Sequence, residues 1–114
     1  MNGGVLVTGR VVSAFRSSLR DGGTALCVIV RPDQRRPGKV HALIPIDGWG
    51  SRMQAIVVAD TMVQRVHEHQ VLQLRGSSLE SWFDHGVDVR LLDPFLMDAT
   101  GVPLAWPEMV EVAA

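Results

Sequence analysis

The chain has 114 residues, of which 46% are hydrophobic and 20% are charged, and its formal net charge is −1. This composition is typical of one soluble globular domain and excludes a disordered chain or a generally basic nucleic-acid binder. No apolar run approaches the roughly 20 residues of a membrane span, and the N-terminus does not resemble a secretory signal. The single Cys27 cannot form an internal disulfide. For these reasons we expect a cytoplasmic protein that has no contact with a membrane.

The charges are distributed unevenly along the chain. Residues 1–40 carry seven basic and two acidic side chains, whereas residues 41–114 carry four basic and ten acidic ones. A protein that binds nucleic acid needs positive charge along one groove rather than over its whole surface. The asymmetry therefore permits a basic groove in a chain whose overall charge is close to zero.

The N-terminal part of the sequence predicts three strands joined by turns. Residues 4–18 are rich in valine and alternate loosely, which favours a long strand with a bend or bulge at Gly9. The Asp-Gly-Gly of residues 21–23 supplies the positive φ angles that a tight hairpin turn needs. Two further apolar runs, at residues 25–32 and 40–46, predict the second and third strands.

The pattern then changes to that of a helix and returns to that of strands. From Met53 to His67 apolar side chains recur at three- and four-residue steps, and Ser51 can cap the first turn. Alternation at residues 69–82 and 87–98 predicts a fourth and a fifth strand. We therefore expect an all-β fold with one helix. This order of elements is that of the OB-fold, a five-stranded Greek-key barrel with a helix between strands 3 and 4.

Several segments resemble the bacterial single-stranded DNA-binding proteins, the SSB family. The runs GVLVTGRVV and LRDGGTALCVIV are similar to the family's first strand and following hairpin. The segment from Trp49 to Asp84 resembles its aromatic-glycine pair, helix and apolar strand ending in glycine, with a tryptophan six residues further on. Gly76 and Trp82 keep that spacing. The resemblance covers about residues 4–98, and we divide the chain into an OB-fold domain over residues 1–100 and a short C-terminal extension over residues 101–114.

The resemblance implies non-catalytic binding of single-stranded DNA with little sequence specificity, in replication, recombination or the DNA processing of mobile elements. The family tryptophan at the position of Trp82 stacks on bases, and since neighbouring residues of a strand face opposite ways, Phe83 is expected in the core. A second stacking tryptophan of the family is replaced here by His41 or Ala42. The short form is closer in size to PriB-type primosomal proteins. The implied partners are single-stranded DNA, further copies of the chain in a homodimer or homotetramer, and replication or primosome proteins.

Basic side chains around the first hairpin and the loop after the second strand are expected to contact phosphates, because such loops border the binding face of an OB-fold. A solvated loop surface is the alternative for these cations. Arg90 could extend the track, whereas Phe15 and Trp106 are weaker candidates for contact. The candidate DNA-binding residues are Trp82, Arg16, Arg20, Arg31, Arg35, Arg36, Lys39, Arg75, Trp49 and His41.

A different class of function stays open: a degenerate OB-fold module that joins proteins and binds nucleic acid weakly or not at all. The net charge and the serines before Trp82 favour this alternative. The charge of the face that bears Trp82 discriminates the two, since a basic face favours DNA. No enzyme activity and no cofactor are expected, because the His67 and His69 pair lacks the further ligands of a metal site and no nucleophile motif is present.

Overall fold

The computed structural model describes residues 4–33, 37–46, 50–81 and 86–107. This part of the chain is mostly β with one helix, as the sequence predicts. Its elements are β1 (Val5–Ser18), β2 (Thr24–Pro32), β3 (Val40–Pro45), α1 (Arg52–His67), β4 (Val71–Gly76), β5 (Ser78–Ser81), β6 (Val89–Leu92) and β7 (Phe95–Asp98). The helix lies between β3 and β4 in the chain, which confirms its predicted place.

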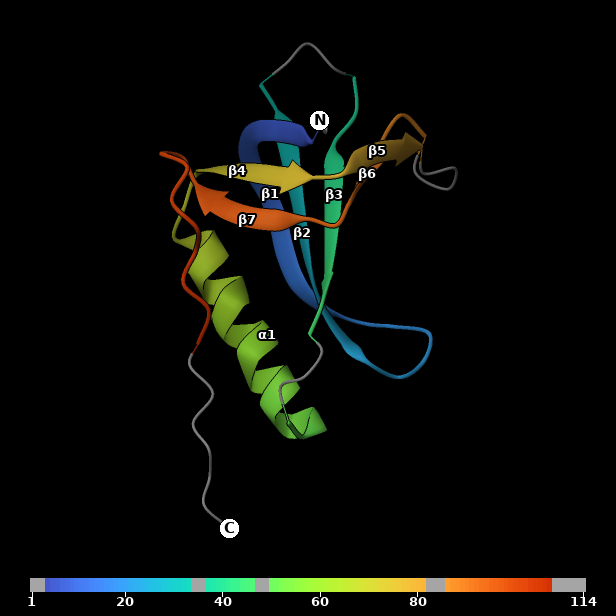
Figure 1. The fold of residues 1–114 in the computed structure, drawn as a ribbon, viewed down its shortest axis with the longest axis vertical. Helices are drawn as coiled ribbons and strands as arrows, with labels where there is room; N and C mark the ends of the chain where they lie inside the picture. Colours follow the sequence, from blue (N-terminus) through green and yellow to red (C-terminus); the bar gives the residue numbers. More distant parts are fainter. Residues whose placement is uncertain (1–3, 34–36, 47–49, 82–85, 108–114) are drawn as a thin grey trace.

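The described strands form one sheet in the order β5-β6-β3-β2-β1-β4-β7. The pairings are antiparallel except for β3 with β6, which run parallel. The sheet is curled into a half-barrel, and Figure 1 shows β4 and β7 turned across the direction of β2 and β3. Curling brings the apolar sides of distant strands together around a shared interior.

The described residues form seven strands where the sequence predicts five, because the fourth and fifth predicted strands are each interrupted. Ser77 separates β4 from β5, and its backbone N–H donates to the Leu92 carbonyl. Asp93, at φ 51°, and Pro94 separate β6 from β7. Since β5 pairs with β6 and β4 pairs with β7, the four short strands are the two halves of one bent hairpin. A hydrophobic pattern of period two does not reveal such interruptions.

The long first strand is irregular at Val12 rather than at Gly9. Its register with β2 shifts between Val11 and Ser13, which makes Val12 the extra residue of a bulge. Gly9 serves a different purpose. A Cβ atom there would lie 2.5 Å from the Arg31 carbonyl oxygen. Glycine therefore allows a close approach of β1 and β2 at a position where β1 is also paired with β4.

The local signals for the first turn and the helix start are confirmed. Gly22 has φ 87°, and Asp21 Oδ1 accepts a 2.8 Å hydrogen bond from the Gly23 backbone in the turn. Ser51 caps α1 as part of a capping box, in which its Oγ accepts from the Gln54 N–H and its own N–H donates to the Gln54 side chain.

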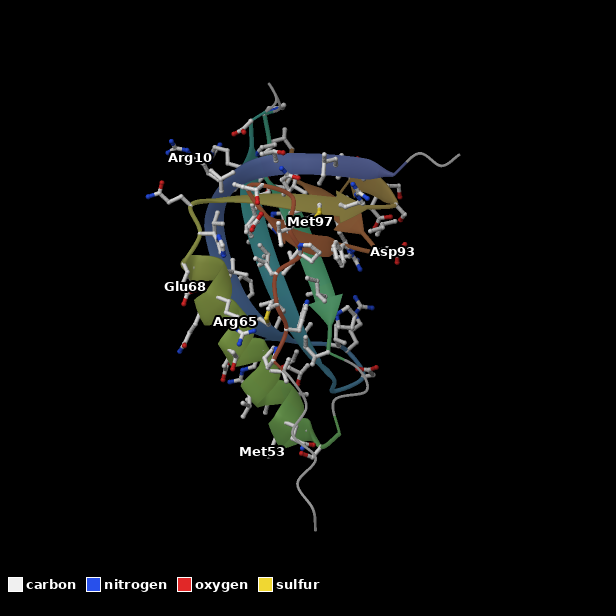
Figure 2. The ribbon with its side chains drawn as sticks, turned by 60° about the vertical axis from the view of Figure 1, so that its left-hand side comes forward. Arg10, Met53, Arg65, Glu68, Asp93 and Met97 are labelled. Carbon is white, nitrogen blue, oxygen red and sulfur yellow. The ribbon has the colours of Figure 1, made fainter. Side chains whose placement is uncertain are left out.

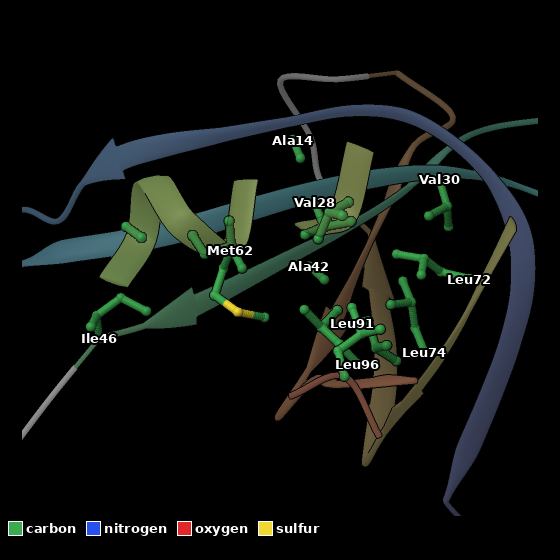
Figure 3. Packing of buried hydrophobic residues seen from close by; sticks show 14 of the residues in the cluster. Ala14, Val28, Val30, Ala42, Ile46, Met62, Leu72, Leu74, Leu91 and Leu96 are labelled. Carbon is green, nitrogen blue, oxygen red and sulfur yellow. The ribbon is translucent and has the colours of Figure 1, made fainter. Parts of the chain in front are cut away.

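The core lies between the inner side of the curled sheet and α1 (Figure 3). Of the predicted apolar stripe of the helix, Ala59 and Val66 are fully buried, as is Met62, whereas Met53 at its start is 69% exposed. The sheet contributes Leu26 and Leu72, which are buried as completely. Each buried side chain of leucine size stabilises the fold by about 1.5–3 kcal/mol relative to exposure.

The described residues after β7 fold back onto the domain rather than extend from it. The Leu104 N–H donates to the Leu96 carbonyl oxygen, Leu104 is buried, and Trp106 packs against the core. The segment runs beside α1, where the Arg65 guanidinium donates to the Ala105 carbonyl (Figures 1 and 2). Within the described residues, α1 is too short and too polar to cross a membrane.

Candidate nucleic-acid interface

The side of the sheet away from the core carries the candidate site. Residues paired across antiparallel strands point to the same side, and successive residues of one strand point to opposite sides. Leu26, Val28 and Val30 of β2 lie in the core, so Cys27 and Ile29 point outward. We call the outward side chains of β2, β3, β5 and β6, together with those of β1 from Ser13 to Ser18, the outer face.

An apolar row crosses the middle of the outer face. Phe15 of β1 is paired with Cys27 of β2, and Cys27 is paired with Leu43 of β3. Phe15 is 43% exposed, whereas Cys27 is only 5% exposed. The row therefore presents an accessible aromatic ring beside a closed apolar surface, which is the kind of platform on which a base can stack.

A more polar row runs beside it. Register places Ser13, Ile29, His41, Arg90 and Glu80 next to one another across five strands. Together with Arg31, which follows Ile29 by two residues on β2, the described strand residues of the outer face include two arginines and one glutamate. These strand side chains are slightly positive in sum, and the carboxylates of Asp88 and Asp93 lie at the margin of the same face.

The side chain of His41, one of the residues in this row, is buried and held by Asp88. It is 6% exposed, and its Nε2 lies 2.7 Å from Asp88 Oδ2. Asp88 Oδ1 also accepts a 2.9 Å hydrogen bond from the Lys39 backbone. The Lys39 bond and then the His41 bond lower the pKa of the Asp88 carboxyl group. The burial of the imidazole ring favours a positioning role for His41 over the stacking role suggested by its place in the sequence.

Two hollows open between the strands of the outer face. The smaller, of about 40 Å³, is lined by Cys27, His41, Leu43 and Arg90. The larger, of about 320 Å³, also includes Leu43 and Arg90 in its lining and extends to the turn between β6 and β7. Burial raises the pKa of the Cys27 thiol, so the sulfur at the base of the smaller hollow stays protonated and is a poor nucleophile.

The predicted basic residues do not gather in one place. Arg31 is on the outer face and is paired with Arg10 of β1. Arg16 is paired with Leu26 and forms a 3.1 Å ion pair with Asp60 of α1, so it belongs to the helix side of the sheet. The Asp60 pairing competes with any phosphate for the Arg16 guanidinium.

The other described basic candidates lie at the margins. Arg20 is exposed in the turn between β1 and β2. Lys39 precedes β3, and its backbone is held by Asp88 and Val89. Arg75 lies on β4, next to Leu6 and Phe95, on the outward side of a different part of the sheet. Four of the candidates lie outside the described residues, as does Phe83: Trp82, Trp49, Arg35 and Arg36.

Sequence reasoning gave little weight to three residues that the structure places well for contact. Phe15 is the accessible ring of the outer face, Arg90 lines both hollows, and Arg10 extends the positive charge of Arg31. Figure 2 shows Arg10 at one end of the sheet and Asp93 at the far side. Strand register was the missing signal, because a side chain can be assigned to a face only once its cross-strand partners are known.

Comparisons with family models, with curated proteins and with solved structures found no match. In the part of the chain that the structure describes, no group of three or more His, Cys, Asp or Glu side chains is arranged to hold a metal ion.

Proposed function

We propose that the protein is an OB-fold module of the single-stranded DNA-binding type that binds single-stranded DNA without catalysis. Three features of topology support the OB assignment: the parallel pairing of β3 with β6, the helix between β3 and β4, and the bent hairpin that joins the two ends of the sheet. In an OB-fold the outward side of the second and third strands is the binding face.

The outer face carries the proposal. Its row of Phe15, Cys27 and Leu43 offers stacking surface, and Arg31 and Arg90 offer positive charge on the same side of the sheet. Stacking of one base contributes about 1–3 kcal/mol and is tolerant of sequence. The stacking role of Trp82 remains a prediction from the sequence, and it would add a second platform.

The test is a titration of a fluorescently labelled oligo-dT of about 15 nucleotides, followed by anisotropy. Because each neutralised phosphate adds about 0.7 to the salt slope, contact with two to four phosphates predicts a loss of affinity of about sevenfold to fiftyfold between about 50 and 200 mM salt. Failure of oligo-dT to bind at the lower salt concentration would remove the proposal.

Phe15→Ala and Phe95→Ala make a matched pair of variants. Both rings are about half exposed, but only Phe15 lies on the outer face. Phe15→Ala should weaken oligo-dT binding about fivefold or more, whereas Phe95→Ala should leave it unchanged. Equal losses would mean that the outer face is not the contact surface. Trp82→Ala is expected to weaken binding several-fold.

The adaptor function is favoured by a different observation. Leu6 and Phe95 flank Arg75 on the outward side of β1, β4 and β7, and these two apolar side chains are 46% and 48% exposed. Exposed apolar side chains of this size suit a protein partner more than a phosphate backbone. A chain that binds no oligo-dT at low salt but forms a stable complex with another protein through this surface would support the adaptor instead.

A further inference from the structure

The larger hollow of the outer face has the size and lining of a site for one nucleotide base. Its volume is about 320 Å³. Leu19 from the turn between β1 and β2, Leu43 and Pro45 from β3, and Pro94 from the turn between β6 and β7 line it with apolar atoms. Apolar walls of this kind favour a ring that has been taken out of water.

Two charged side chains of opposite sign also line this hollow. Arg90 of β6 supplies hydrogen-bond donors, and Asp93 supplies the acceptor oxygens of a carboxylate. The Ser77 hydroxyl donates a 2.8 Å hydrogen bond to Asp93 Oδ2, which fixes the side chain against the turn. The carboxylate opposes entry of a phosphate, so the hollow suits a neutral ring with polar edges better than it suits the DNA backbone.

The donor groups of Arg90 and the acceptor oxygens of Asp93 together discriminate among the four bases. Guanine presents two acceptors, O6 and N7, on one edge, which are the usual partners of an arginine. Its N1–H and N2–H₂ groups are donors that match a carboxylate. Thymine has one ring N–H between two carbonyl groups, adenine lacks a ring N–H, and cytosine offers a carboxylate only its N4 amino group, so none of the three satisfies both residues as well.

We propose that this pocket, between the β1–β2 turn and the β6–β7 turn, takes one guanine base of the bound strand, with Arg90 and Asp93 as the residues that recognise its edges. The inference rests on the proposed function, since it assumes that a single strand lies along the outer face. It adds a preference for guanine at one position to binding that otherwise tolerates any sequence.

The test compares oligo-dT of about 15 nucleotides with the same oligonucleotide carrying a single dG, dA or dC near its centre. The dG strand should bind at least about fivefold more tightly than the other three, which corresponds to one good pair of hydrogen bonds to a base edge. Sliding of the strand along the face allows its one guanine to reach the pocket.

Asp93→Asn is the variant of choice, because asparagine tolerates the positive φ of this position and the backbone should be undisturbed. It should abolish the preference for dG while oligo-dT binding persists. Glu68→Gln is the matched control: it removes one negative charge at the C-terminal cap of α1, away from the pocket, and should keep the preference intact. Thermal melts of both variants are the check that they fold.

The outcomes separate the two proposals. Binding of oligo-dT without any gain from dG, or a gain that survives in Asp93→Asn, would overturn the guanine pocket and leave single-stranded DNA binding in place. A loss of the preference in Glu68→Gln as well would overturn the assignment to Asp93. Absence of binding to all four oligonucleotides would overturn the proposed function and, with it, the pocket.

Discussion

At the scale of single residues, Asp88 joins two of the strands that carry the outer face. Its carboxylate accepts from the Lys39 backbone just before β3 and contacts His41 near the start of β3, while Asp88 itself precedes β6. Asparagine at this position keeps one acceptor oxygen and replaces the other with a donor group, so one of the two hydrogen bonds loses its acceptor. Asp88→Asn should therefore lower the free energy of unfolding by about 1–2 kcal/mol at neutral pH, measured by urea denaturation.

The same residue predicts how stability depends on pH. The folded pKa of Asp88 is lowered, so the unfolded chain binds the proton more readily than the folded one. Its stabilising contribution is complete above the ordinary aspartate pKa and is lost as the pH falls through the lowered folded value. Between pH 7 and strongly acidic conditions the wild type should lose more free energy of unfolding than Asp88→Asn. Asp60→Asn, at an exposed site on α1, is the control, and identical losses in the wild type and Asp88→Asn would contradict the prediction.

At the scale of elements, the sequence predicts what is local and misses what depends on distant contacts. The helix, its Ser51 cap and the Asp-Gly-Gly turn are all specified within a few residues of themselves, and all three are confirmed. The break at Ser77 is different, because it is defined by a bond to Leu92 from another strand. The candidate site shows the same dependence on distant contacts, because Asp60 of α1 determines where the Arg16 side chain lies and Asp88 determines where the His41 side chain lies.

The bend between β4 and β5 makes a prediction about Gly76. A Cβ atom there would lie 2.5 Å from both Leu91 Cδ1 and the Leu92 carbonyl oxygen, so the two arms of the bent hairpin meet at this glycine. Gly76→Ala should cost about 1–3 kcal/mol of unfolding free energy, because one arm must shift. Gly4→Ala provides the control, since the nearest atom to its Cβ lies at 3.4 Å. Equal effects of the two substitutions in urea denaturation would argue against a close crossing.

At the scale of the whole molecule, the residues after β7 complete the domain. Asp98 Oδ1 accepts from the backbone N–H groups of Thr100 and Val102 and so turns the chain back toward the sheet. Hydrogen bonds from Thr100 and Val102 also lower the pKa of this carboxyl group. Pro103 then pairs with Met97, and Leu104 reaches the core beside Leu96. Described residues on both sides of the division expected at residue 100 therefore pack against the same core.

The final prediction concerns how the described residues after β7, which lie away from the outer face, contribute to stability. Leu104→Ala removes a side chain that is 9% exposed and packs with the core, so it should lower the free energy of unfolding by about 2 kcal/mol or more. Val102→Ala, at a side chain that is 56% exposed, should change it by less than about 0.5 kcal/mol. Urea denaturation of the two variants is the measurement that checks both changes. Because Leu104 is not part of the outer face, Leu104→Ala should also keep its oligo-dT affinity under folding conditions. If Leu104→Ala is as stable as Val102→Ala, the described residues after β7 do not stabilise the domain. If Leu104→Ala instead loses oligo-dT affinity while it is fully folded, the DNA contacts more of the molecule than the outer face.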